Sequence, residues 1–219
     1  YQLKLNFSRK YRVPTFNDLY WVGSGNPDLK PENSYQGEIG NQFSYKKFRL
    51  TLTAYGMKIS DMIRWLPNNT GNWSPLNTDK VSIYGAEALL GWHKKSRNHS
   101  FDFSGTYAYT VSLDDATNKQ LFYVPYHKLT SSISYSYKKF GSYVQLLYTG
   151  EVFTTSDNNP KYILDDYAIS NLGVDYNFSK KNVFKIGFKV ANLWNENYET
   201  LPNRFMPGRN LTLYLTLNY

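Results

Sequence analysis

The side chains best suited to chemistry in this sequence are cationic and aromatic residues that fall between its predicted strands. Aromatic rings offer flat faces for stacking, and arginine offers a planar cation that can lie against a ring or pair with an anion. This mixture suits a flat aromatic or an anionic metal chelate. The same side chains could instead pack the loops or join an aromatic belt. The residues concerned are Trp21, Arg64, Trp65, Trp73, Phe122, Tyr123, Arg204 and Phe205.

Catalytic groups are sparse by comparison. His93, His99 and His127 are isolated, and the sequence has no paired-histidine metal motif, nucleophile elbow or glycine-rich phosphate loop. The runner-up enzyme class is a hydrolase that uses His127 with Ser131 or Ser132, for which composition is the only support. We therefore expect a protein that is not an enzyme and has no catalytic residue, cofactor or bound metal.

Acidic pairs in the expected loops are the remaining candidates for ion binding. Asp114-Asp115 and Asp165-Asp166, with Asp157 near the second pair, supply oxygen atoms of the kind that calcium prefers. Solvated loop charges are the preferred interpretation, and a calcium site is the alternative.

The elements that must position these residues are β-strands, because apolar and polar residues alternate in ten segments. The last segment is the clearest, since Leu211, Leu213, Leu215 and Leu217 alternate with polar residues or tyrosine and the chain ends on Tyr219. Alternation with a period of two gives a strand one apolar face, and no segment has helical periodicity. The ten segments are 1–8, 34–45, 48–54, 84–92, 101–111, 128–137, 144–148, 171–178, 184–190 and 211–219.

The connections between these segments alternate between long and short. Long connections are expected at 9–33, 63–79, 112–126, 151–162 and 194–208, and short ones near 46–47, 93–99, 138–141 and 179–182. Lysine pairs mark the four short turns and predict one basic rim. These pairs are Lys46-Lys47, Lys94-Lys95, Lys138-Lys139 and Lys180-Lys181.

Composition narrows the class of protein. The chain has 219 residues with 21 Tyr, 13 Phe and 5 Trp, which is typical of β-rich proteins. No apolar run approaches the roughly 20 residues of a transmembrane helix. The absence of cysteine excludes a disulfide scaffold. The net charge of +8 could indicate nucleic acid, but the paired lysines between strands do not form a continuous basic and aromatic groove, so we expect no nucleic-acid partner.

Together these patterns predict an all-β fold, an antiparallel up-and-down transmembrane β-barrel. Such barrels alternate lipid-facing and lumen-facing residues, have short turns at one end and long loops at the other, and carry aromatic girdles. Aromatic residues lie at the strand ends here, at Tyr45, Trp92, Tyr137, Tyr176 and Tyr219. A soluble sandwich would not sort its loops by length. A soluble lipocalin-like barrel would bury its apolar side chains inside and have shorter loops.

Several motifs in order along the chain resemble those of TonB-dependent outer-membrane receptors, most closely the vitamin B12 and siderophore receptor type. An R-x-P-x-F-x-x-L-Y segment precedes N-P-x-L-x-P-E, a strand entry ends in G-x-E, and N-L-[FW]-[DN]-x-x-Y precedes P-G-R. The matching residues are Arg12, Pro14, Phe16, Leu19, Tyr20, Asn26, Pro27, Leu29, Pro31, Glu32, Gly85, Glu87, Asn192, Leu193, Tyr198, Gly208 and Arg209.

The resemblance implies an architecture and a role. Residues 1–219 would be the C-terminal part of a barrel of about 22 strands, with the plug domain and the N-terminal strands absent. The receptor would lie in the lipid of the bacterial outer membrane and import a nutrient chelate such as an iron siderophore, haem or cobalamin. It would draw energy from the TonB–ExbB–ExbD complex through the missing plug region. The alternative is a barrel that does not transport, such as a porin or an adhesin.

Three more expectations concern single motifs. The proline-rich connection from Arg12 to Glu32 is interpreted as a structural brace in preference to a ligand contact, because proline fixes the backbone. Glu87 should face the lumen, since charge on the lipid face is costly. The ending at Leu213, Leu215, Leu217 and Tyr219 resembles the signal that the outer-membrane barrel assembly machinery reads.

Overall fold

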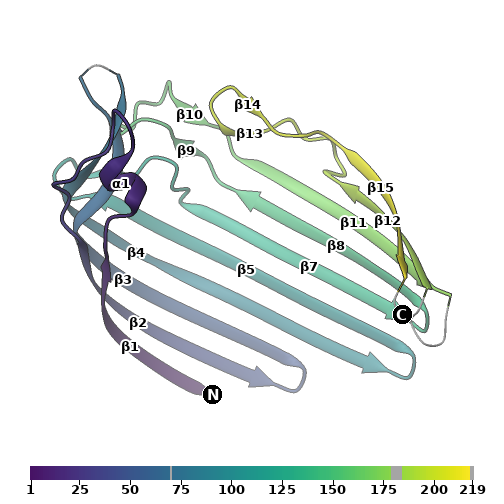
Figure 1. The fold of residues 1–219 in the computed structure, drawn as a ribbon. Helices are drawn as coiled ribbons and strands as arrows, with labels where there is room; N and C mark the ends of the chain where they lie inside the picture. Colours follow the sequence, from purple (N-terminus) through teal and green to yellow (C-terminus); the bar gives the residue numbers. More distant parts are fainter. Residues whose placement is uncertain (70, 179–183, 218–219) are drawn as a thin grey trace.

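The computed structural model describes residues 1–69, 71–178 and 184–217, and ten long strands dominate it (Figure 1). They form one antiparallel sheet in which each strand pairs with the next long strand along the chain, as the alternation predicts. The long strands are β1 (Gln2–Arg12), β2 (Glu32–Tyr45), β3 (Phe48–Pro67), β4 (Trp73–Ser96), β5 (His99–Asp114), β7 (His127–Tyr137), β8 (Phe140–Thr149), β11 (Tyr167–Asn177), β12 (Phe184–Ala191) and β15 (Asn210–Leu217).

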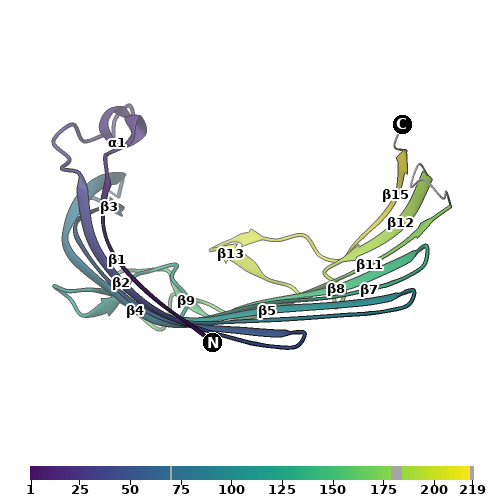
Figure 2. The ribbon, with the colours of Figure 1, turned by 90° about the horizontal axis from the view of Figure 1, so that it is seen from below.

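The sheet curves into an open trough with β1 at one edge and β15 at the other (Figure 2). Among the described residues these two edge strands do not pair with each other. Short elements occupy the end where the connections are long. These are the helix α1 (Phe16–Tyr20) and the strands β6 (Lys119–Gln120), β9 (Val152–Phe153), β10 (Ile163–Leu164), β13 (Glu199–Leu201) and β14 (Arg204–Phe205). In the described part of the chain, no helix has the length and apolar character needed to cross a bilayer.

The register confirms the predicted faces of the strands. Apolar residues stand opposite one another in a continuous row that runs through Trp92, Phe103, Ile133, Val144, Leu172, Val190 and Leu211. The neighbouring row on the other face contains Gly91, Ser104, Ser132, Gln145 and Asn171. Directly opposed residues in an antiparallel pair point to the same side of the sheet. One face of the trough is therefore apolar and the other mainly polar. Leu213, Leu215 and Leu217 lie on the apolar face, whereas Tyr219 lies outside the described residues.

Two-residue turns close three of the hairpins at the short-connection end. Lys46-Lys47, Arg97-Asn98 and Lys138-Lys139 form these turns, and the first residue of each has a positive φ of 53°, 51° and 53°. Tight hairpins favour this left-handed geometry because it matches the twist of the strands. The prediction that Lys94-Lys95 form a turn is wrong, since the pairing of Ser96 with His99 keeps them within β4. Lys180-Lys181 lie outside the described residues.

The loop end departs from the prediction at one connection. Residues 63–79 were expected to be a long loop, but β3 continues to Pro67 and β4 begins at Trp73, so only 68–72 connect them. This stretch lacks clean alternation. Residues 62–67 pair with 73–78 as strands, and hydrogen bonds with residues 26–32 hold the paired segment in place. The other four connections are long, at 13–31, 115–126, 150–166 and 192–209.

A small hydrophobic core lies beneath one of these loops. Ile59 and Val81 face each other on β3 and β4 and are 7% and 0% exposed, and Leu121 of the 115–126 loop packs against them with 6% exposure. Burial of apolar area is the main stabilising contribution of such a contact. The loop is therefore anchored to the sheet rather than free in solvent.

Three tyrosines on the polar face lie over glycines of the adjacent strand. Tyr55, Tyr143 and Tyr214 stand opposite Gly85, Gly173 and Gly187 respectively. A Cβ atom added to Gly173 or Gly187 would meet the opposing ring at 2.2 Å. One added to Gly85 would meet the Tyr109 carbonyl oxygen at 2.2 Å and the Tyr55 hydroxyl at 2.6 Å. Close approach of the neighbouring strand therefore requires glycine at all three positions, which is a known use of glycine inside a strand.

Candidate ligand-binding site at the loop end

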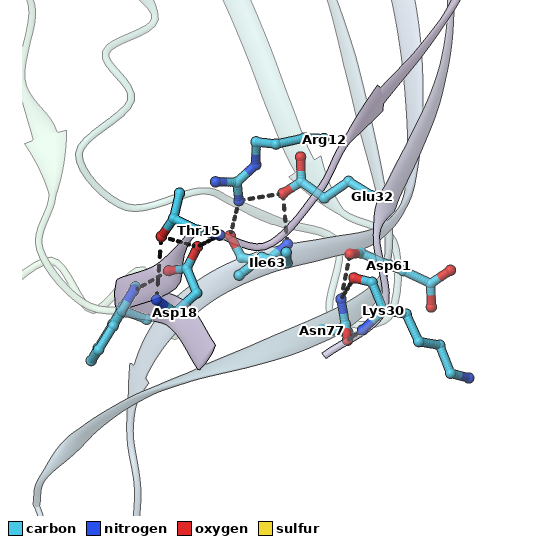
Figure 3. A network of polar contacts seen from close by, with 9 residues as sticks. Arg12, Thr15, Asp18, Lys30, Glu32, Asp61, Ile63 and Asn77 are labelled. Carbon is cyan, nitrogen blue, oxygen red and sulfur yellow. Dashed lines mark hydrogen bonds and ion pairs between the residues drawn. The ribbon is translucent and has the colours of Figure 1, made fainter. Parts of the chain in front are cut away.

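Arg12 and Glu32 lie at the two ends of the connection between β1 and β2. They form an ion pair, and both hydrogen-bond to the backbone of Ile63 on β3 (Figure 3). Arg12 Nη2 lies 2.6 Å from Glu32 Oε1 and donates to the Ile63 carbonyl oxygen at 3.1 Å. The same Glu32 oxygen accepts from the Ile63 N–H at 2.7 Å. The hydrogen bond to Glu32 raises the pKa of Arg12 against the opposing effect of burial. One ion pair thus joins three strands at the point where the loop leaves the sheet.

Helix α1 is a single turn that begins with a capping box. Asp18 N–H donates to Thr15 Oγ1 at 3.2 Å, and Thr15 N–H donates to Asp18 Oδ2 at 2.9 Å. The Trp65 indole N–H donates to Asp18 Oδ1 at 2.9 Å and so fixes the helix on β3. Burial alone would raise the pKa of Asp18, but the hydrogen bonds from Thr15 and Trp65 and the charge of Arg12 lower this pKa overall. The indole N–H of Trp65 is therefore already engaged within the protein.

Asparagine side chains complete the attachment of the 13–31 loop. The Lys30 N–H donates to Asn77 Oδ1 at 2.8 Å, and Asn77 Nδ2 donates to the carbonyl oxygens of Lys30 and Asp61 at 3.0 and 2.7 Å (Figure 3). Asn26 Nδ2 donates to the Pro75 carbonyl at 3.1 Å. These bonds satisfy backbone groups that a loop would otherwise leave to water. The network has the form expected of a brace between the loop and the β3–β4 hairpin.

The remaining motif residues of this loop divide into buried and exposed positions. Leu29 is buried, whereas Phe16 is 76% exposed and its ring lies 5.0 Å from that of Tyr20. Pro14, Leu19, Pro27 and Pro31 belong to the same connection. Their positions do not indicate a role in ligand binding.

A second brace orders the 192–209 connection. Asn192 is 4% exposed, and its Nδ2 donates to the Glu196 carbonyl at 2.8 Å while its Oδ1 accepts from the Glu196 N–H at 2.8 Å. Asn195 Oδ1 accepts from the Arg209 N–H at 2.8 Å and would lie only 2.7 Å from a Cβ added to Gly208. The Tyr198 ring lies 4.5 Å from that of Tyr167, and Leu193 N–H donates to the Ser170 carbonyl.

Glu87 lies on the polar face of the sheet, opposite Thr53 and Ala108. The sequence predicts that Glu87 faces the lumen, and the polar face is the one that would do so. Gly85, two residues earlier, is the glycine beneath Tyr55.

Four of the eight predicted ligand-binding residues come together at the loop end. The guanidinium carbon of Arg64 lies 5.0 Å from the centre of the Phe122 ring, and Trp73 and Tyr123 contact the same ring at centroid distances of 6.4 and 5.6 Å. Arg64 Nη1 also lies 3.4 Å from Asp114 Oδ2. We call Arg64, Trp73, Phe122 and Tyr123 the loop-end aromatic cluster.

The Arg64 side chain is held in place within this cluster. It is only 9% exposed, and burial lowers its pKa while the Asp114 carboxylate acts in the opposite direction. Arginine nevertheless keeps its charge in proteins. A desolvated cation against an aromatic ring interacts more strongly than one in water, with estimates of about 2 kcal/mol. The cluster therefore presents a fixed positive charge beside aromatic rings that pack edge to face.

Tyr123 is held in an unusual backbone conformation. Its φ is 60°, which costs a non-glycine residue about 1–2 kcal/mol, and its N–H donates to the Phe153 carbonyl at 2.8 Å. Burial raises the pKa of the Tyr123 phenol, so the hydroxyl stays neutral and can donate a hydrogen bond. The 115–126 loop is thus fastened to the 150–166 loop at this residue.

Two hollows adjoin the cluster. One, of about 360 Å³, lies between β3 and the 115–126 and 150–166 loops and is lined by Arg64, Leu66, Asp114, Thr117, Lys119, Gln120, Leu121, Ser156 and Asp157. The other, of about 170 Å³, is lined by residues of three loops, among them Tyr123, Asp165 and Glu199, and by strand residues such as Lys128. A larger hollow of about 490 Å³ lies at the opposite end. Its lining includes four serines, three exposed cations, the neighbouring rings of Phe48 and Trp92, and the His93–Asp102 pair. The smaller pair is the better candidate, because it adjoins the buried Arg64 guanidinium and the rings packed around it, whereas the charged side chains of the larger hollow are exposed.

The other four predicted residues lie elsewhere. Trp65 belongs to the brace, and Trp21 follows α1 with 57% of its surface exposed. Arg204 and Phe205 are exposed on β14, whose only pairing in the described chain is with β13. These residues therefore do not join Arg64 in one site.

Sequence reasoning missed residues that assemble the site. Gln120 is 3% exposed, its Oε1 accepts from the Ser112 N–H at 2.8 Å, and its backbone exchanges two hydrogen bonds with the Asn158 amide. No local pattern reveals a pairing 38 residues apart. Asp18 was also missed, although its spacing from Thr15 is that of a capping box.

The groups considered for catalysis do not converge. His127 Nδ1 lies 2.8 Å from the Tyr107 hydroxyl. Ser131 and Ser132 lie further along β7 on opposite faces. Within residues 1–69, 71–178 and 184–217, no group of three or more His, Asp or Glu side chains is arranged to hold a metal ion.

Comparison with known proteins gives one matching family model, described as the TonB dependent receptor-like β-barrel, over residues 1–193. The vitamin B12 transporter BtuB of Photobacterium profundum is 30% identical over 201 residues, which cover 90% of this chain and 32% of that protein. The iron-regulated outer membrane virulence protein of Vibrio cholerae serotype O1 is 27% identical over 191 residues, covering 78% of this chain and 28% of its own length. The chain thus spans about a third of the length of these relatives.

Among solved structures, the copper transporter OprC superposes with a TM-score of 0.78 at 16% identity. The match covers 97% of this chain and 36% of OprC. At this identity the likeness speaks for the fold alone.

Proposed function

The chain belongs to the TonB-dependent receptor family, and from this premise we propose that it is the C-terminal part of the barrel of an outer-membrane importer for a scarce metal chelate. The family consists of outer-membrane receptors and transporters rather than enzymes. The open edges of β1 and β15 and the roughly one-third coverage of the relatives support a larger barrel. A plug domain and further strands would complete it.

The loop-end aromatic cluster is the observation that carries the binding proposal. Arg64 supplies a buried positive charge, and Phe122 and Trp73 supply ring faces, next to a hollow of about 360 Å³. Hollows of about 300–1,000 Å³ with a few placed polar groups are typical of ligand sites. An anionic or aromatic chelate fits this chemistry. Iron siderophores and haem are such chelates, and cobalamin is a further candidate because one relative is named a vitamin B12 transporter.

Import would need partners that this chain does not include. We propose that the TonB–ExbB–ExbD complex acts on the missing plug region, and that the barrel assembly machinery inserts the receptor through its last strand. A porin or an adhesin remains the competing role. Uptake of the bound chelate that stops when TonB is deleted would distinguish an importer from both.

Ligand binding can be tested on the full-length receptor that contains this chain. The purified receptor is titrated with cyanocobalamin, haemin and a ferric catecholate, and tryptophan fluorescence reports binding. For the chelate that binds, we expect Phe122→Ala to weaken affinity about tenfold, in line with loss of one aromatic contact and its cation–π partner. Phe16→Ala, which removes a loop-end phenylalanine outside the cluster, serves as the control. Equal affinity in both variants would contradict the assignment of the site.

A further inference from the structure

Exposed cations gather at the end of the sheet where the turns are short. We call them the turn-end cation rim, and they are Lys46, Lys47, Lys94, Lys95, Arg97, Lys138 and Lys139. They come from three successive two-residue hairpins and the adjoining end of β4. Figure 1 shows these hairpins side by side along one margin of the sheet.

Three of the six lysines of this rim lie on the apolar face or close to its aromatic rings, whereas Lys95 stands on the polar face. Lys46 Nζ lies 5.1 Å from the centre of the Tyr45 ring, and Lys138 Nζ lies 5.2 Å from that of Tyr137. Both tyrosines stand in rows of the apolar face, opposite Phe48 and Phe140. Lys94 lies on the same face and stands opposite Phe101. Two ammonium groups thus lie beside the aromatic residues that end the membrane-facing surface, and Lys94 shares that face.

No carboxylate neutralises these lysines on their own face. The strand register gives the face of each paired residue. Among the described residues of the ten long strands, every aspartate and glutamate that is paired in this register lies on the polar face. The two nearest ones are already paired there, Asp102 with His93 and Asp175 with Lys185. The rim therefore presents uncompensated positive charge toward the membrane.

We propose that the turn-end cation rim binds the phosphate headgroups of anionic phospholipids in the leaflet that meets the short turns. Aromatic belts mark the depth of the headgroups, and lysines near them extend their charged ends to that level. Each basic residue near an anionic surface strengthens binding by about fivefold. This inference rests on the membrane location of the barrel and not on the nutrient it carries, so it can fail while the proposed import stands.

The experiment compares lipid selectivity of the full-length receptor in vesicles of phosphatidylcholine with or without phosphatidylglycerol. Spin-labelled phosphatidylglycerol reports its association relative to labelled phosphatidylcholine. We expect wild type to prefer phosphatidylglycerol, and the combined variant Lys46→Gln, Lys94→Gln, Lys138→Gln to lose most of that preference. The control variant removes three positive charges from the loop end through Lys30→Gln, Lys119→Gln and Lys161→Gln. It should keep the preference for phosphatidylglycerol.

Two further measurements keep the inference open to refutation if the rim variant folds poorly. For wild type, the preference should fall as salt rises, because exposed charges are screened. Inorganic phosphate added to the solution should not abolish it, since the proposed ligand is the bilayer surface. A preference that persists in a folded rim variant, is lost equally in the control variant, or is abolished by free phosphate at constant ionic strength would overturn the proposal.

Discussion

A matched pair of arginine substitutions on β7 tests which face of the sheet meets lipid. Ile133 and Ser132 are neighbours near the middle of β7, and their side chains stand in the apolar and polar rows respectively. Ile133 is 53% exposed, so an arginine there would meet solvent or lipid rather than a packed core. Ile133→Arg and Ser132→Arg therefore place the same charge at the same depth on opposite sides of one strand.

The expected magnitude follows from the position of Ile133 along its strand. Tyr137, at the turn end of β7, is four residues away, which is about 13 Å along the strand. For a strand tilted by about 35–45°, this places Ile133 about 10 Å from the interface and close to the middle of an apolar band about 25 Å tall. Arginine at that depth on the lipid face costs about 2–4 kcal/mol, and a lumen position costs little. The folding equilibrium should therefore shift roughly 30- to 700-fold for Ile133→Arg.

The assay is urea unfolding of the full-length receptor in phosphatidylcholine vesicles, followed by the gel shift that separates folded from unfolded barrel. Ile133→Arg should unfold at lower urea concentration than wild type, and Ser132→Arg should stay close to wild type. A control substitution, Ile133→Val, keeps the apolar face intact. If both arginine variants were equally destabilised, or if Ser132→Arg were the worse, the assignment of faces would be refuted.

Three further outcomes are expected. In whole cells, an impermeant maleimide should label Asp157→Cys in a long loop but not Arg97→Cys in a short turn, because long loops of outer-membrane barrels are extracellular; the reverse pattern would invert the topology. The pKa of Asp18 is lowered in the folded state, so its carboxylate stabilises the brace at pH values above the usual carboxyl range. This stability is lost as the pH falls through the lowered pKa. Protease cleavage within 13–31 should therefore rise at low pH in wild type and be pH-independent in Asp18→Asn. Gln120→Ala leaves a buried backbone N–H unpaired at a cost of about 1–3 kcal/mol and should speed proteolysis of the 115–126 loop, whereas Lys119→Ala should not.

The strands and their faces could be predicted from sequence because a period of two is a local signal. The row from Trp92 to Leu211 follows from alternation within each segment, once neighbouring strands pair in order. The ends of the strands could not be predicted in the same way. Residues 63–67 and 73–77 lack alternation. They pair with each other as strands, and Asn77 and Ile63 also bond to Lys30 and Glu32.

The candidate site could likewise be predicted from the sequence only in part. Residue type alone indicated Arg64, Trp73, Phe122 and Tyr123, which meet in the structure. It could not separate them from Trp21, Arg204 and Phe205, because the separation depends on how the loops fold back. Asp114, the anion beside Arg64, lies 50 residues away and was grouped instead with Asp115 as a loop charge.

The tyrosine–glycine pairs on the polar face set the bore of the channel that a complete barrel would enclose. The rings of Tyr55, Tyr143 and Tyr214 reach across the backbone of the neighbouring strand only because the glycines beneath them have no side chain. Large residues thereby line the wall without projecting their full length inward. An alanine at Gly173 or Gly187 would lift the opposing ring toward the axis. In such a wall, the clearance left for whatever fills or crosses the barrel is determined by positions that carry no side chain at all.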